Sequence, residues 1–188
     1  WSFLAVFALV FLGSVAILAE LDLLSQMSPA PVAVSVDTNK PVPADAVELP
    51  VKIEIPAIAL TANVTNPATI DVEALDQKLL SGAVRYPTSS RLGETGNVVL
   101  FGHSSYLPVV GNQAYKTFNG IQKLVAGDVI TVYSADTAYT YRVRDVSKES
   151  AASDAGINLA VTNRVLTLAT CDSFGKKSDR FVVTADFV

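Results

Sequence analysis

Short runs of apolar or alternating residues, separated by turn-forming residues, follow one another from Val51 to the C-terminus. Such runs are typical of β-strands. We expect strands over residues 51–55, 97–101, 129–133, 138–146, 164–171 and 180–188. A short helix is expected over 71–80, with Asp71 as its N-cap, and another within 114–124. Many short strands, few helices and no alternation of strand with helix predict a mostly β fold, an antiparallel or mixed barrel or sandwich.

The N-terminal end has a different composition. Its first 19 residues carry no charge, and about 20 apolar residues suffice to cross a bilayer. We therefore expect a transmembrane signal-anchor helix over residues 1–24, although a cleaved signal peptide or a buried helix would also be apolar. Glu20 and Asp22 follow the run, and the first basic residue is Lys40. The positive-inside rule then predicts a single-pass protein of the cell membrane whose remaining chain is extracytoplasmic.

Two further regions follow the apolar run. Residues 25–50 are rich in Pro and Ala and are expected to form an extended linker, and residues 51–188 are expected to form the folded domain. The formal net charge of −4 and the lack of a basic patch argue against nucleic acid as a partner.

The chain contains a single cysteine, Cys171, and a single histidine, His103, and each ends a predicted strand. A polar, turn-rich segment over 172–179 separates Cys171 from Arg180. If this segment closes a hairpin, Cys171 and Arg180 lie side by side on the more polar face, while Leu166 and Leu168 point to the opposite, core-forming face. A thiolate, an imidazole and a guanidinium could then supply a nucleophile, a proton-transfer group and an oxyanion stabiliser. Taken singly, each of these residues is more often structural.

Three separated motifs resemble those of the sortases, the cysteine transpeptidases of bacterial surfaces. Residues 167–171, TLATC, match the TLxTC pattern, residues 96–104 resemble the strand that leads to the family's histidine, and residues 178–183 resemble its ending with Arg180. Residues 53–58 and 82–87 also fit, so that the likeness covers about 51–188. The resemblance implies a closed eight-stranded β-barrel with short helices.

The same resemblance implies a function. Cys171 would be the nucleophile, His103 the acid/base and Arg180 the oxyanion or substrate stabiliser. The enzyme would cleave an LPxTG-like sorting signal after Thr through a thioester, and transfer the acyl group to an amine or to water. Its partners would be surface proteins that bear a sorting signal and an amine acceptor, either a peptidoglycan precursor or a pilin lysine. No cofactor and no metal are expected, since few carboxylates (Glu149, Asp154) are available for a calcium site.

Two other functions remain open at this stage. One is a cysteine transpeptidase that cross-links peptidoglycan directly, although such enzymes usually place a Ser/His-Gly-Cys turn at the nucleophile and this chain has Ala169-Thr170-Cys171. The other is a non-catalytic or degenerate membrane-anchored β-domain that binds a partner. Residues 107–111, LPVVG, resemble a sorting signal only superficially, because no Thr precedes the Gly.

Overall fold

The computed structural model describes residues 4–7, 47–150, 156–171 and 179–188. The chain divides into two compact units, Trp1–Asn39 and Lys40–Val188. In the first unit, residues 4–7 are helical. Within the described ranges, no helix combines the length and apolar character needed to cross a bilayer. Most of the predicted membrane span over 1–24 and of the predicted linker over 25–50 lies outside the described residues.

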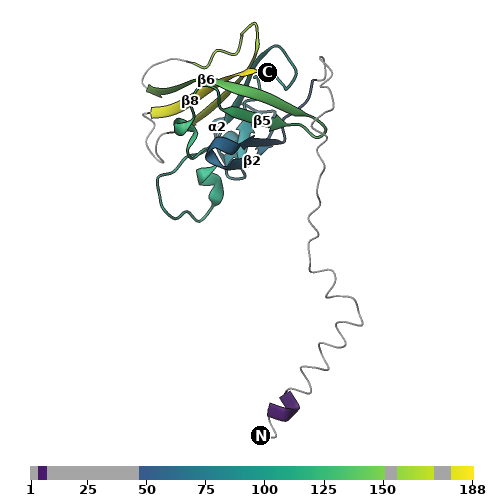
Figure 1. Ribbon diagram of the computed structural model, residues 1–188, viewed down its shortest axis with the longest axis vertical. Coiled ribbons are helices and arrows are strands. Elements are labelled where there is room, and N and C mark those ends of the chain that lie inside the picture. Colours follow the sequence, from purple (N-terminus) through teal and green to yellow (C-terminus); the bar gives the residue numbers. More distant parts are fainter. Residues whose placement is uncertain (1–3, 8–46, 151–155, 172–178) are drawn as a thin grey trace. The chain divides into compact units, whose positions relative to one another are not determined.

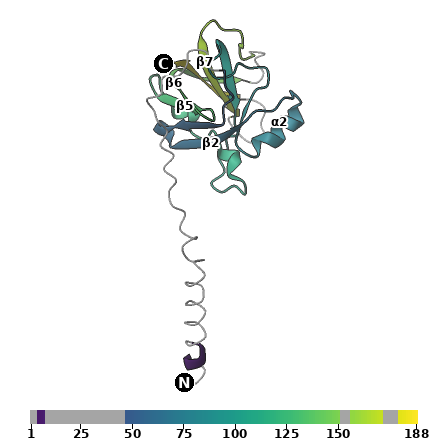
Figure 2. The ribbon, with the colours of Figure 1, turned by 90° about the vertical axis from the view of Figure 1, so that its right-hand side faces the viewer.

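The second unit is a closed β-barrel, as predicted, with eight strands in its described part. Around the barrel the strands follow the order β1-β2-β3-β4-β7-β8-β6-β5. The ribbons show this arrangement, with α2 outside the barrel wall (Figures 1 and 2). The elements are β1 (Lys52–Ile55), η2 (Pro56–Ile58), β2 (Leu60–Thr65), α2 (Val72–Leu79), β3 (Ala83–Arg85), β4 (Gly96–Phe101), η3 (Gln113–Lys116), η4 (Ile121–Lys123), β5 (Val129–Tyr133), β6 (Ala138–Ser150), β7 (Arg164–Cys171) and β8 (Asp179–Phe187).

Local sequence explains where the first elements begin and end. β1 alternates so that Ile53 and Ile55 are fully buried in the barrel. Pro56, which has no N–H to donate, ends the strand and begins η2. The predicted cap of α2 is confirmed, since the Asp71 carboxylate accepts a hydrogen bond of 2.9 Å from the backbone N–H of Ala74.

The barrel is mixed. β2 pairs in parallel with β3 and β4 in parallel with β7, while the remaining neighbours are antiparallel. Leu166 and Leu168 of β7 and Val183 and Ala185 of β8 point inward, and all four have no exposed surface. The predicted alternation of the two C-terminal strands, with this face as core, is therefore confirmed.

Three parts of the strand prediction were incomplete or wrong. β2 and β3 were not expected, because each offers only a short and weakly alternating run. β6 continues to Ser150 rather than ending at Val146. Its last residues are polar, and they remain in a strand because each pairs with β8, ending with Ser150 opposite Asp179. Backbone pairing here overrides the weak local pattern.

Candidate active site

Three neighbouring strands of the barrel, β4, β7 and β8, bring the predicted site residues to the same edge of the barrel. The antiparallel register places Cys171, the last residue of β7, directly opposite Arg180 of β8. The parallel register places Phe101 of β4 opposite Ala169 of β7, and the Gly102 N–H continues this ladder by donating to the Ala169 carbonyl at 3.2 Å. His103 and Cys171 are each two residues further along. The topology therefore brings the ends of β4 and β7 and the start of β8 to the same edge of the barrel.

His103 lies directly beyond the end of β4 and is half-buried. Its carbonyl accepts a hydrogen bond of 2.9 Å from the Phe118 N–H, and its ring lies 5.4 Å from the ring of Tyr115 in η3, tilted by 38°. Burial lowers the pKa of His103 below its usual value of 6.5, and the negative charge of Asp76 in α2 partly opposes this. The lowered pKa favours the neutral imidazole, which is the form that can accept a proton.

The backbone that carries His103 fits tightly against the core. A Cβ atom at Gly102 would lie 2.6 Å from the ring of Phe118, which is fully buried. Because such a separation is far inside van der Waals contact, only glycine fits at this position. The close approach fixes the path of the chain immediately before the imidazole.

Arg180 is held by a carboxylate from the strand on its other side. Glu149 of β6 lies directly opposite Arg180 in the antiparallel register. Its Oε2 accepts hydrogen bonds from Nε at 3.1 Å and from Nη2 at 2.8 Å, and each side chain is 29% exposed. The sequence analysis did not find this pair, because it expected β6 to end before Glu149.

The segment between β3 and β4 is organised by a buried arginine. Arg85, only 6% exposed, donates to the carbonyls of Tyr86, Pro87 and Ser89 and to the side chain of Asn66. Burial lowers the pKa of Arg85, the positive charge of Arg91 acts in the same direction, and the negative charge of Glu94 partly opposes both. Tyr86 in turn packs edge-on against Phe101, with ring centroids 5.9 Å apart. Arg85 thus links this loop to the end of β4.

The comparisons with known proteins agree with this geometry. The family model described as the Sortase domain matches residues 53–188. The chain belongs to the sortase family. Sortase A of Bacillus anthracis is 31% identical to this sortase over 142 residues, which cover 73% of the chain and 59% of that relative. The chain therefore spans only about three fifths of the length of this relative.

Solved sortase structures share the fold. Sortase C-1 from Actinomyces oris aligns with a TM-score of 0.58 and 23% identity, and the match covers 73% of this sortase and 72% of that chain. The Sortase D5 transpeptidase of Clostridium perfringens aligns with a TM-score of 0.56 and 23% identity, covering 73% and 77% respectively. At this level of identity, these matches establish the barrel fold alone.

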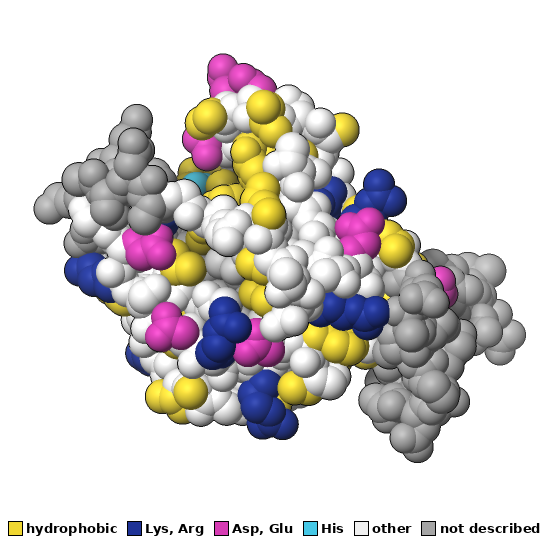
Figure 3. Space-filling model, turned by 90° about the horizontal axis from the view of Figure 1, so that it is seen from above, with side chains coloured by type: hydrophobic (Ala, Val, Ile, Leu, Met, Phe, Trp, Pro, Cys, Tyr) yellow, Lys and Arg dark blue, Asp and Glu magenta, His cyan; other side chains and the backbone are white. Residues whose placement is uncertain are grey.

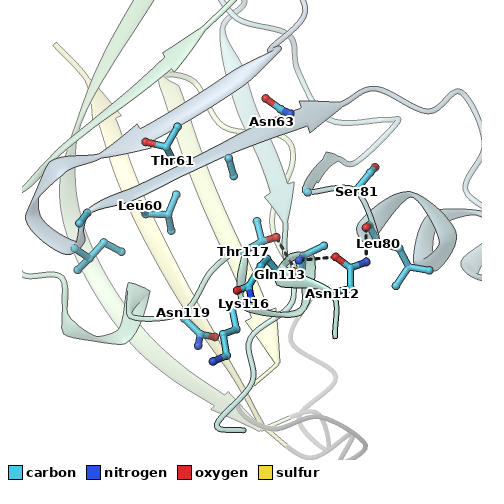
Figure 4. Close-up of a pocket in the computed structure, with 15 residues that line it drawn as sticks. Leu60, Thr61, Asn63, Leu80, Ser81, Asn112, Gln113, Lys116, Thr117 and Asn119 are labelled. Atoms are coloured by element: carbon cyan, nitrogen blue, oxygen red, sulfur yellow. Dashed lines mark hydrogen bonds between the residues drawn. The ribbon is translucent and has the colours of Figure 1, made fainter. Parts of the chain in front are cut away.

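Two cavities lie near the site of this sortase. One, of about 790 Å³, is lined by Ser104, which follows His103, by Phe181, which follows Arg180, and by residues of the 105–108 loop and of η4. The other, of about 580 Å³, lies between β2, the end of α2 and η3, on which Tyr115 contacts His103. Figure 4 shows this second cavity, where the Asn112 amide donates to the Leu80 carbonyl at 2.8 Å.

The charges on this sortase are mixed. On the face shown in Figure 3, basic and acidic side chains are interspersed among hydrophobic ones. Within the ranges that the structure describes, no group of three His, Cys, Asp or Glu side chains is arranged to hold a metal ion.

Proposed function

We propose that this protein is a cysteine transpeptidase that acts on a sorting-signal peptide. The observation that carries the proposal is the alignment of Cys171, Arg180 and the end of β4 at one edge of the barrel. This alignment combines the thiol, the guanidinium and the imidazole that acyl transfer through a thioester needs. The 790 Å³ cavity that reaches from Ser104 to Phe181 offers room for a peptide beside them.

The reaction has two halves. The Cys171 sulfur attacks the carbonyl carbon of Thr in an LPxTG-like signal, and its proton passes to the neutral imidazole of His103. His103 then protonates the departing amine as the peptide bond breaks, and leaves a thioester. An incoming amine, from a peptidoglycan precursor or a pilin lysine, attacks the thioester carbon and gives up a proton to His103. The carbon–sulfur bond then breaks, and the Cys171 sulfur leaves and takes that proton, which restores the free thiol. Water in place of the amine gives hydrolysis. Arg180 stabilises the negative oxygen in both halves.

Trapping of the acyl-enzyme tests this proposal. Incubation with a panel of LPxTG-type peptides should add the mass of the acyl fragment to Cys171, and added amine should convert it to a transpeptidation product. Cys171→Ala should abolish both products while the circular dichroism spectrum stays unchanged. Turnover by this variant, or the absence of an adduct with every peptide, would reject the proposal. New cross-links in muropeptides would favour the alternative cell-wall transpeptidase, and binding without turnover the non-catalytic domain.

The proposal also includes the location of the enzyme. The uncharged stretch over residues 1–19 supports a single-pass anchor with the barrel outside the cytoplasm. Fractionation of cells that make the full chain should recover it with membranes, and external protease should digest the barrel without lysis. A chain that stays in the soluble cytoplasmic fraction would contradict this location.

A further inference from the structure

The ladder between β6 and β8 carries two cross-strand ion pairs of different geometry. Near one end, Arg144 Nη1 lies 2.7 Å from Asp186 Oδ1, and the two side chains are 54% and 41% exposed. At the other end, one carboxylate oxygen of Glu149 binds both Nε and Nη2 of Arg180, and both side chains are only 29% exposed. Two bonds to one guanidinium edge restrict its orientation, whereas a single bond leaves it free to rotate.

Glu149 occupies a particular place relative to the reacting residues. The registers place Glu149, Arg180 and Cys171 in one row across β6, β8 and β7. Residues directly opposite each other on neighbouring strands point to the same face, so the row is continuous. Two strand spacings put the Glu149 and Cys171 backbones roughly 10 Å apart. Glu149 is therefore two strands away from Cys171 and directly opposite Arg180.

We propose that Glu149 is a positioning residue, which holds the Arg180 guanidinium in the orientation that stabilises the oxyanion. This inference rests on the proposed function of Arg180. An arginine side chain has many rotamers, and fixing one before the reaction removes that cost from the transition state. The carboxylate also has an opposing effect, because its negative charge disfavours a thiolate at Cys171. The benefit of orientation outweighs this electrostatic cost.

The two effects can be separated with two variants and a matched control. Glu149→Gln removes the charge and thereby weakens both bonds to the guanidinium, while Glu149→Asp keeps the charge on a shorter side chain that cannot reach both nitrogens. Asp186→Asn removes the acid of the other ion pair on the same ladder. For each protein, kcat and KM are measured with the best sorting-signal peptide, together with the pH at which alkylation of Cys171 by iodoacetamide is half-maximal. Cys171 is the only cysteine, so the alkylation signal is unambiguous.

We expect kcat to fall about tenfold in both Glu149 variants with little change in KM, since the oxyanion that a correctly oriented Arg180 stabilises forms only in the transition state. The alkylation midpoint should move down by roughly 0.3 pH unit in Glu149→Gln, from Coulomb's law at this separation in water, and stay unchanged in Glu149→Asp. Asp186→Asn should alter neither quantity. Loss of folding would not explain this combination of a lower alkylation midpoint and a lower kcat in Glu149→Gln.

Three results would overturn the inference. These are kcat values within twofold of the wild type in both Glu149 variants, an equal loss of kcat in Asp186→Asn, or a fall confined to KM. If the wild type turns over no sorting-signal peptide, the proposed function fails separately. In that case the alkylation midpoint is the remaining test of the inference. A downward shift in Glu149→Gln but not in Asp186→Asn supports the placement of Glu149 in one row with Arg180 and Cys171, and equal midpoints in all proteins reject it.

Discussion

The β4–β7 pair and the β6–β8 pair meet at the same site but differ in their surroundings. β4 and β7 are parallel, and the residues of both faces are buried from Asn97 to Leu100 and from Val165 to Thr170. β6 and β8 are antiparallel, and along β6 buried side chains give way to exposed ones such as Arg144 and Lys148. Burial on both faces is typical of parallel strands, and one exposed face of antiparallel ones. His103 and Cys171, the proposed acid/base and nucleophile, therefore lie at the ends of strands that are buried on both faces. The Arg180 guanidinium is instead held by a partly exposed ion pair with Glu149.

The largest expected difference between the two pairs concerns packing. Gly102→Ala would push a methyl group into the ring of Phe118, so we expect unfolding to become easier by about 1–3 kcal/mol, and His103 to be displaced. Gly111→Ala is the matched control, because a Cβ there meets nothing within 4 Å, and its effect should stay within about 0.5 kcal/mol. Urea denaturation measures both. Equal stabilities would show that the end of β4 is not tightly packed.

A smaller effect is expected on the β6–β8 side. Asp186→Asn removes a cross-strand ion pair whose side chains are about half exposed, so it should lower the free energy of unfolding by less than about 1 kcal/mol. The loss should shrink further in high salt, because solvent screens such charges. Denaturation at two ionic strengths tests this. A loss as large as that of Gly102→Ala would contradict the contrast between the two pairs.

The smallest effect concerns the charge of Asp76 in α2, which acts on His103 beyond the end of β4. Asp76 raises the pKa of His103 against the larger, opposite effect of burial, so Asp76→Asn should lower that pKa further. The imidazole would then take up its proton at lower pH, and the acidic limb of kcat/KM should move the same way. NMR titration of the single histidine measures the shift directly. Glu73→Gln, on the same helix, is the control, and an unchanged or raised pKa would refute the assignment.

Much of the barrel can be predicted because its core strands alternate clearly. Leu166, Leu168 and Val183 define the inner face of the last two strands. This alternation, together with the assumption that residues 172–179 close a hairpin, placed Cys171 beside Arg180, as the register confirms. The expectation that their shared face is the more polar one was less accurate. Thr167, Ala169 and Val182 on that face are each 5% exposed or less. Alternation indicates which residues share a face, but it does not reveal what covers that face.

The rest of the site depends on contacts that no local pattern records. The Glu149–Arg180 pair requires the register of two strands, and its sequence neighbourhood is polar. Tyr115 and Asp76 influence His103 only because η3 and α2 pack beside the end of β4. Arg85 resembles any surface arginine in the sequence, and only the fold shows that it is buried among carbonyl groups. The motifs therefore indicated the proposed reacting groups, while the residues that contact them could be found only in the structure.

The parallel pairing of β4 with β7 also has a consequence for folding. It joins Phe101 to Ala169, which are 68 positions apart in the chain. Contacts of such sequence separation form late, because the entropy of closing the intervening loop must be overcome first. His103 and Cys171 therefore cannot meet in a partly folded chain that contains only local hairpins. The proposed activity should therefore be among the last properties to return on refolding. The rate at which acyl-enzyme formation returns would then report the rate at which the barrel closes.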